Sequence, residues 1–194
     1  MSQTKRQEQK EITRQRIIDT ALRVYAAKGF STPTNIIAQE AGISHGTIFV
    51  HFPTKEILQH DVLEQFASQV GNELHKLSLT SEDISELLYA HINILKKYES
   101  FYKKIILEIA LLPSETKETL ISLQSTMSWH FNIVVERLQK CRLIKDIPLH
   151  MLFNTWIALV HYYLQNAELF APDTSVLERC GDELVSTFVT LISK

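Results

Sequence analysis

Glycine and proline are scarce in this sequence, with only five of each among 194 residues. Proteins built from many short strands need more of these residues in their turns, so the scarcity favours long helices. No alternation with a period of two runs for a useful length, whereas apolar residues recur at helical spacing from about residue 11 onward. We therefore predict an all-α protein of about nine helices.

Cysteine is also scarce. Cys141 and Cys180 stand 39 positions apart, with no CxxC motif and no cysteine–histidine cluster. This spacing argues against a disulfide framework or a zinc site, and we expect two reduced, buried thiols. No apolar run approaches the roughly 18–20 residues of a membrane span. The first 11 residues are polar and charged, unlike a secretory signal, so a cytoplasmic protein is expected.

The net charge of −2 hides an asymmetry along the chain. Residues 1–60 contain eight Lys and Arg against five Asp and Glu, whereas residues 61–194 contain 12 against 17. A mildly basic head on an acidic body is typical of a DNA-reading module carried by another kind of domain. Lys5, Arg6 and Lys10 form either a solvated arm, the favoured interpretation, or an arm that enters a DNA groove.

Two short helices are expected around a glycine-containing turn at about residues 32–52. Thr32 and Pro33 predict an N-cap followed by proline at the first helical position. Gly42 gives the turn its backbone freedom, and Ser44 caps the second short helix. The pattern is that of a helix-turn-helix, whose second helix lies in the major groove of DNA.

Longer helices flank this pair. The first begins near residue 11 and ends at Gly29, which suits a left-handed C-terminal residue. The next is capped by Thr54, starts at Lys55 and reaches about Leu77. We expect a three-helix DNA-binding domain over residues 1–54 and a helical effector-binding and dimerisation domain over residues 55–194. The outer face of the second short helix carries Ser44, His45, Thr47, Val50 and His51.

At this point a resemblance becomes specific. The segment Ile36–Glu56, IIAQEAGISHGTIFVHFPTKE, is similar to the DNA-binding domain of the TetR family of bacterial transcriptional regulators. The first helix of that domain is matched by Ala21, Tyr25, Gly29 and Phe30. The resemblance covers about residues 12–60. It implies a homodimer that binds operator DNA, in most cases as a repressor released by a small molecule.

The resemblance also implies a role for individual residues. The positions implied near base edges are His45, Gly46 and Thr47, and those implied near phosphates are Ser44, Phe49, His51, Thr34, Asn35 and Lys55, with Val50 on the same outer face. Two departures stand out. Phe49 occupies a position where the family most often has tyrosine, so a phosphate-contacting hydroxyl is missing. The loop between Phe30 and Ile37 is one residue shorter than usual.

The rest of the chain predicts five further helices, at about residues 82–98, 101–112, 115–141, 149–169 and 176–192. The segment 105–112 is apolar almost all round and should be buried, with Glu108 at an edge or paired. Apolar walls with a few polar groups suit a small-molecule pocket. The candidate ligand contacts are His91, Phe101, Glu108, Trp129, His130, Trp156 and Tyr163, for which ordinary core packing is an equal interpretation.

The last two helices are the expected dimer interface, since in the family they form a four-helix bundle with the partner's pair. The final helix places one apolar stripe there, made of Leu184, Val185, Phe188, Leu191 and Ile192. A ligand in the body is expected to shift the helix that starts at Lys55, and with it the spacing of the two recognition helices.

The sequence leaves three alternatives to a ligand-responsive regulator. The body could bind a protein partner instead of a small molecule. An enzyme is disfavoured, because no nucleophile–base pair, carboxylate pair, phosphate-binding glycine loop or metal cluster is recognisable. His60, Asp61 and Glu64 have metal-like spacing but fit a solvated helix face better. A helical adaptor is disfavoured by the basic head and the turn glycine. No cofactor, metal or membrane contact is expected.

Overall fold

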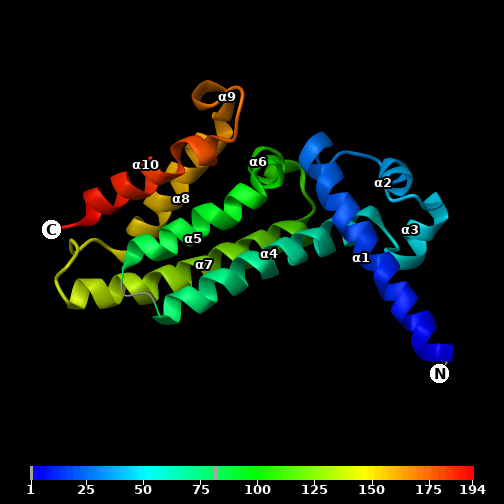
Figure 1. Ribbon diagram of the computed structural model, residues 1–194, viewed down its shortest axis with the longest axis horizontal. Coiled ribbons are helices and arrows are strands. Elements are labelled where there is room, and N and C mark those ends of the chain that lie inside the picture. Colours follow the sequence, from blue (N-terminus) through cyan, green and yellow to red (C-terminus); the bar gives the residue numbers. More distant parts are fainter. Residues whose placement is uncertain (1, 81–82) are drawn as a thin grey trace.

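The computed structural model describes residues 2–80 and 83–194, and these residues form ten α-helices and no β-strand. The all-α prediction is therefore confirmed. Three helices form the head at one end of the molecule, namely α1 (Ser2–Lys28), α2 (Thr34–Glu40) and α3 (His45–His51). The others form the body (Figure 1), namely α4 (Lys55–Thr80), α5 (Ile84–Lys97), α6 (Glu99–Glu108), α7 (Ser114–Lys140), α8 (Leu149–Gln165), α9 (Ala167–Phe170) and α10 (Val176–Ile192).

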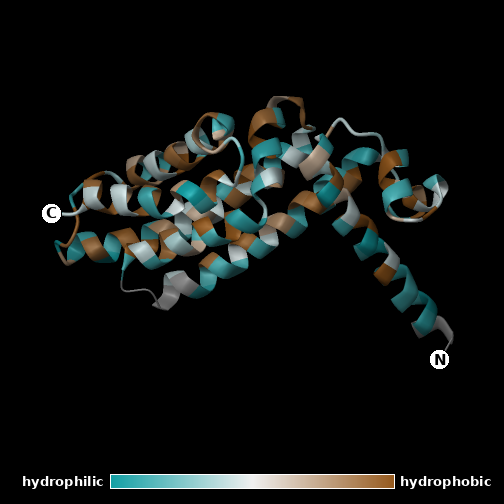
Figure 2. Ribbon diagram, turned by 45° about the horizontal axis from the view of Figure 1, so that its top comes forward, coloured by the Kyte–Doolittle hydropathy of each residue, from teal (hydrophilic) through white to brown (hydrophobic). Residues whose placement is uncertain are grey.

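The predicted helix boundaries need four corrections. Helix α1 begins at Ser2 rather than near residue 11, and its N-terminal turns are mainly hydrophilic (Figure 2). The helix predicted over 101–112 ends at Glu108 and continues as a short 3₁₀ turn. The helix predicted over 149–169 is interrupted at Asn166, which separates α8 from α9. The predicted start at Glu82 lies outside the described residues.

The fourth correction concerns the cap of α2. Pro33, not Thr32, takes the N-cap position, and Thr32 instead donates its hydroxyl to the carbonyl of Gly29 at 2.7 Å. The predicted cap of α3 is confirmed, since the Ser44 side chain accepts from the Thr47 amide. Gly29 and Gly42 both have positive φ, +85° and +64°, as their turns require.

A chain of aromatic side chains joins the head to the body. Phe30 stacks on Tyr25 in the head, with 4.9 Å between ring centroids, and contacts Phe101 of α6 at 5.6 Å. Phe66 of α4 lies 5.5 Å from Phe101, edge to face. Because all of these rings are buried, α1, α4 and α6 share one continuous core at the junction.

Three predictions about burial are wrong. Leu111 is 82% exposed, and Leu107 at the end of α6 and Ile109 in the following 3₁₀ turn are also exposed, so the segment 105–112 is not buried all round. Cys141 is exposed, whereas Cys180 is buried as expected, and both are free thiols. The apolar stripe of α10 packs inside its own chain against α5 and α8, so among its members only Leu191 is exposed.

None of the described helices combines the length and apolar character that a membrane crossing requires.

Candidate functional site

The first turn of α3 is fixed by two hydroxyl groups. The Ser44 Oγ accepts a hydrogen bond from the Thr47 amide at 3.2 Å and lies 2.7 Å from the Thr47 Oγ1. The same amide also donates to the Ser44 carbonyl at 3.0 Å, so the side chain and the backbone of Ser44 together close the first turn of α3. Ser44 remains exposed and Thr47 is partly exposed, so both hydroxyls stay within reach of a partner outside the chain.

The start of α2 and the start of α3 are tied together. The Nε2 of His45 lies 2.9 Å from the Oγ1 of Thr34, although Thr34 is buried and His45 is exposed. The His45 ring also meets the ring of Phe49 edge to face, with 5.0 Å between centroids. Thr34, His45 and Phe49, three of the predicted DNA contacts, therefore lie together. Asn35, which follows Thr34, is exposed.

Gly46 is a glycine that the fold itself does not require. Its φ is not positive, and a Cβ added there would meet nothing nearer than the Ser44 Oγ at 3.9 Å. Gly42, by contrast, is held at a left-handed φ of +64° that disfavours other side chains. A glycine inside a helix destabilises it by up to about 1 kcal/mol relative to alanine. The described residues therefore leave room for a side chain at position 46.

The two sides of α3 differ sharply in exposure. Ile48 is 1% exposed and packs into the head, whereas Val50 is 69% and Phe49 is 44% exposed. These two large apolar side chains lie on the same surface as His45 and Gly46. Helix α3 itself carries no acidic residue.

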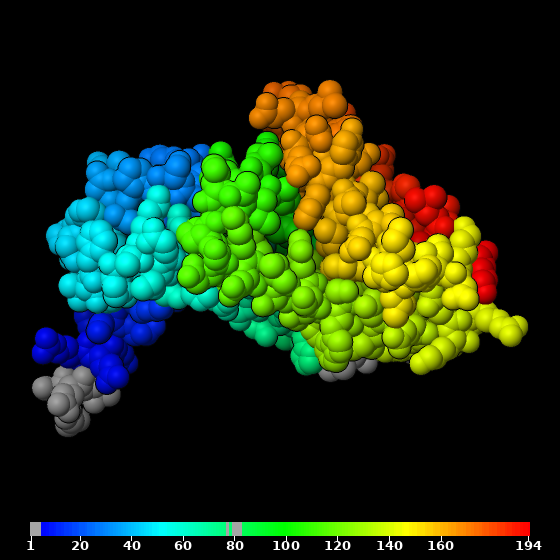
Figure 3. All heavy atoms as spheres, turned by 180° about the vertical axis from the view of Figure 1, so that it is seen from behind, coloured from blue at the N-terminus to red at the C-terminus, as the bar shows by residue number. Residues whose placement is uncertain are grey.

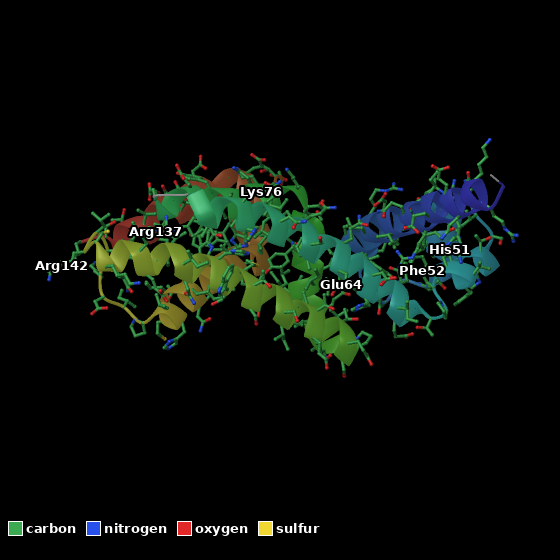
Figure 4. The ribbon with its side chains drawn as sticks, turned by 90° about the horizontal axis from the view of Figure 1, so that it is seen from below. His51, Phe52, Glu64, Lys76, Arg137 and Arg142 are labelled. Carbon is green, nitrogen blue, oxygen red and sulfur yellow. The ribbon has the colours of Figure 1, made fainter. Side chains whose placement is uncertain are left out.

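His51 differs from its expected place on the outer face, because it is partly buried where α3 meets α1 (Figure 4). Its buried Nδ1 has no hydrogen-bond partner among the described residues. Desolvation lowers the pKa of His51, and the nearby charges of Lys10 and Arg14 lower it further. The neighbouring Phe52 is buried, with the Arg14 guanidinium 5.0 Å from its ring centroid.

Lys55 is engaged within the chain. Its Nζ donates to the carbonyl of Ser31 at 2.9 Å, which ties the start of α4 to the turn between α1 and α2. Desolvation lowers its pKa. Of the residues with metal-like spacing, His60 contacts Thr119 at 3.1 Å and Asp61 pairs with Arg14.

The backbone of Phe30 is held by two body helices at once. Its amide donates to the Glu108 Oε2 of α6 at 2.8 Å, and its carbonyl accepts from the Gln59 Nε2 of α4 at 2.9 Å. Gly29 leaves room for this contact, since a Cβ there would lie 2.4 Å from the Glu108 Oε1. We call Phe30, Glu108 and Gln59 the junction clamp. Sequence reasoning missed Gln59, although a polar residue on the apolar face of α4 is a signal.

The body contains a small enclosed cavity between α4, α5, α7 and α8, with a volume of about 20 Å³. It is lined by Leu74, Leu87, Leu88, His91, Met127, His130, Phe131, Phe153 and Trp156. The structure thus brings together three of the predicted ligand contacts. Among these, the Trp156 Nε1 donates to the His91 Nδ1 at 3.0 Å, and burial lowers the pKa of His91 to about 3.

The other predicted ligand contacts lie elsewhere. Phe101 belongs to the aromatic junction, and Glu108 belongs to the junction clamp with an ion pair to Lys104 at 3.9 Å. Trp129 is 55% exposed on α7. Tyr163 is partly buried and stacks on Phe170 of α9, with 4.4 Å between centroids. These four residues therefore do not share the cavity of His91.

A second hollow of about 250 Å³ opens to the surface between α6, α7 and α8 (Figure 3). Its wall includes Tyr102 and His161, whose Oη and Nε2 lie 2.8 Å apart. Desolvation lowers the pKa of His161 to about 4 and raises that of Tyr102. Ile109 and Ile121, two of the exposed apolar residues, form part of its lining.

With this geometry in view, comparison with known proteins identifies the head. Residues 17–62 match the family model described as bacterial regulatory proteins, tetR family. The HTH-type transcriptional regulator AcrR of Shigella flexneri is 24% identical over 202 aligned positions, which cover 98% of this chain and 94% of that one. The uncharacterized regulator YerO of Bacillus subtilis (strain 168) is 37% identical over 73 residues, 37% of this chain and 24% of that protein.

Solved structures share the whole fold. A transcriptional regulator FadR from Bacillus subtilis, crystallised with stearoyl-CoA, has 17% identity and a TM-score of 0.72, covering 91% of this chain and 97% of that one. A regulator from Saccharomonospora viridis in complex with choline has 19% identity and a TM-score of 0.77, covering 95% and 99%. Residues 17–62 thus match the TetR family of bacterial regulatory proteins, and the whole chain has the fold of these solved transcriptional regulators.

Proposed function

We propose that this chain is a ligand-responsive repressor that binds operator DNA as a homodimer, with residues 1–54 as the DNA-binding domain and residues 55–194 as the effector-binding and dimerisation domain. The observation that carries DNA reading by α3 is Gly46. The fold gives no reason for a glycine there, and it lies among exposed side chains at the start of the second helix of a helix-turn-helix.

The proposed contacts follow from position along the two short helices. His45, Gly46 and Thr47 lie at the N-terminal end of α3, which enters the major groove in this motif. Thr34 and Asn35 begin α2, where free amides attract a phosphate. Ser44, Phe49, Val50, His51 and Lys55 complete the proposed surface, with Lys55 exchanging its carbonyl partner for a phosphate.

The dimer is proposed to form through the outer faces of α8 and α10. Met151, Thr155, Ala158 and Tyr162 are exposed at a spacing of three or four residues, so they form one stripe along α8. Two heads on one rigid frame multiply the affinity of a single head. Sedimentation velocity of a Met151→Asp, Tyr162→Asp variant should show a monomer, whereas a dimer of unchanged stability would place the interface elsewhere.

The effector is proposed to act through α4. Leu74, near the far end of α4, lines the body cavity, and Lys55 at its near end follows the recognition helix directly. A ligand that widens the cavity displaces α4 from α7, and the junction clamp passes the movement to the turn before α2. The ligand shifts binding only to the extent that it prefers one of the two states.

DNA reading by α3 is tested by fluorescence anisotropy on DNA from upstream of the gene that encodes the chain, over a series of salt concentrations. The variant His45→Ala, Thr47→Ala should lose at least tenfold in affinity. A control variant, His150→Ala, Thr126→Ala, changes the same residue types at exposed positions of the body and should bind as the wild type does. Equal losses in both variants would argue against reading by α3.

A second candidate function is favoured by one observation, the exposed apolar residues Ile109 and Ile121 in the lining of the hollow between α6, α7 and α8, with Leu107 and Leu111 exposed nearby in the sequence. Exposed apolar surface of this kind often marks a protein-binding site. In this alternative the body binds a protein instead of a small molecule. Thermal unfolding of the purified chain with and without small molecules would distinguish the two hypotheses. A small molecule that raises the unfolding temperature supports a ligand-binding body, because only a molecule that binds the folded state stabilises it.

A further inference from the structure

His91 presents a buried hydrogen-bond donor that nothing in its surroundings satisfies. The indole nitrogen of Trp156 can only donate, so the Nδ1 of His91 is the acceptor of their 3.0 Å hydrogen bond. A neutral imidazole that accepts at Nδ1 carries its proton at Nε2. That Nε2–H has no partner among the described residues, and His91 is 3% exposed.

The side chains around this donor favour an uncharged ligand. The remaining lining of the cavity is almost wholly leucine, methionine and aromatic, and it contains no carboxylate, lysine or arginine. Burial lowers the pKa of His91 to about 3, so the ring is neutral at physiological pH. A charged ligand would find no opposite charge here and would lose its hydration.

The cavity and a surface groove share one lining residue. His130 lines the cavity, and it also lines a groove of about 370 Å³ between α4 and α7 that includes Ala67, Gly71 and Thr126. A 2.8 Å contact between its Nδ1 and the Ser78 Oγ holds the ring in place. His130 therefore stands between the two spaces, and Met127 beside it has an unbranched side chain that can repack around a ligand.

We propose that the effector is a compact, uncharged and mainly apolar molecule with one hydrogen-bond acceptor, that it enters past His130, and that its acceptor takes the Nε2–H of His91. This inference rests on the proposed function for its regulatory meaning, whereas the binding site itself stands on the cavity. The volume of about 20 Å³ holds no more than about one water, so the ligand must enlarge the cavity, and its acceptor then takes a donor that no described residue satisfies.

The test uses three probes of nearly the same shape. Cyclohexanone carries an acceptor, methylenecyclohexane replaces its carbonyl oxygen by a methylene group, and cyclohexylamine is a cation at pH 7. Binding to the full chain is followed by long-range ¹H–¹⁵N NMR of the histidine rings. We expect cyclohexanone to bind about tenfold more tightly than methylenecyclohexane and to shift the His91 Nε2–H signal, because it alone makes the hydrogen bond. Cyclohexylamine should not bind.

Two variants and a matched control make the test specific. His91→Phe removes the donor but keeps an apolar ring, and it should bind the ketone and the alkene equally. Trp156→Phe removes the donor that fixes the tautomer of His91, and it should reduce the preference while the fold remains. His161→Phe replaces a partly buried histidine of α8, outside this cavity, and should keep the wild-type preference.

Equal binding of the ketone and the alkene to the wild type overturns the proposal. So does a preference that survives in His91→Phe, and so does a failure of cyclohexanone to bind at millimolar concentration. A ketone that binds at His91 without weakening operator binding supports the site and rejects the effector part of the proposed function. The two hypotheses therefore fail in distinguishable ways.

Discussion

His45 of the head and His91 of the body lie in opposite surroundings. In the head, His45 lies at the surface, where its ring contacts Thr34 and Phe49 and remains open to solvent. In the body, His91 and His161 are enclosed, and burial lowers their pKa values to about 3 and about 4. An exposed side chain such as His45 can be substituted with little change in the free energy of unfolding. A buried side chain such as His91 contributes to the stability of the fold as well as to any binding.

The largest effect on stability is expected from a substitution beside the buried His91. Trp156→Ala should lower the free energy of unfolding by about 3–5 kcal/mol, because it opens a cavity and leaves the His91 Nδ1 without its donor. Val50→Ala, on the exposed face of α3, should change it by less than about 0.5 kcal/mol. Urea unfolding followed by circular dichroism measures both, and similar losses in the two variants would erase the distinction.

Acid should act on the body through the same histidines. Their folded-state pKa values lie below the unfolded value of about 6.5, so the unfolded chain binds more protons as pH falls below it. Stability should be complete above pH 6.5 and should fall by roughly 2–4 kcal/mol between pH 7 and pH 5. Urea titrations at several pH values test this, and His91→Phe should remove about half of the slope.

The junction clamp should link stability to signalling. Glu108→Ala should lower the free energy of unfolding by about 1–3 kcal/mol, because the buried Phe30 amide loses its acceptor. It should also weaken the response of operator binding to an effector. Glu108→Gln keeps an acceptor and serves as the control. If both variants respond to effector as the wild type does, the head receives its signal through α4 alone.

Gly46→Ala tests whether stability and operator affinity respond separately at the exposed start of α3. A Cβ meets no atom closer than 3.9 Å, and alanine favours a helix, so stability should rise by up to about 1 kcal/mol. Operator affinity should fall about tenfold, because the methyl group holds α3 away from the groove. Anisotropy and thermal unfolding on the same sample measure the two effects, and loss of both together would show that the glycine is structural.

The smallest expected effect is at Phe49. A tyrosine there adds a hydroxyl to an exposed ring, and a new hydrogen bond to phosphate should raise operator affinity by about two- to tenfold. The gain should shrink as salt increases, since phosphate contacts are salt-dependent. An unchanged affinity across the salt series would place Phe49 away from the DNA backbone.

The sequence predicts the fold well because its signals are local. Ser44 at the cap of α3 and the glycines of the two turns act within a few residues of where they stand, so periodicity and turn chemistry locate them. The break at Asn166 was missed because the apolar pattern continues through it. The N-cap of α2 was misplaced by one residue because Thr32 also suits a cap but bonds back to Gly29.

The candidate sites were predictable only in part, because contacts between distant segments leave little trace in one sequence. Glu108 reaches Phe30 across 78 positions, so its place in an apolar run shows that it needs a partner but not which one. The stripe of α10 shows an apolar face without showing whether the chain itself or a second copy covers it. His91 and Trp156 were singled out separately, and only the structure joins them in one hydrogen bond.

The contact between Gly29 and Glu108 also sets a rule for recombining heads and bodies. A head that carries glycine at position 29 suits a body whose α6 ends in a carboxylate at position 108, because the missing Cβ makes room for that group. A chimera built by cutting at Thr54 would separate these two residues into different parents. The hybrid head would then dock on its new body with the Phe30 amide satisfied only where that body also offers an acceptor at position 108.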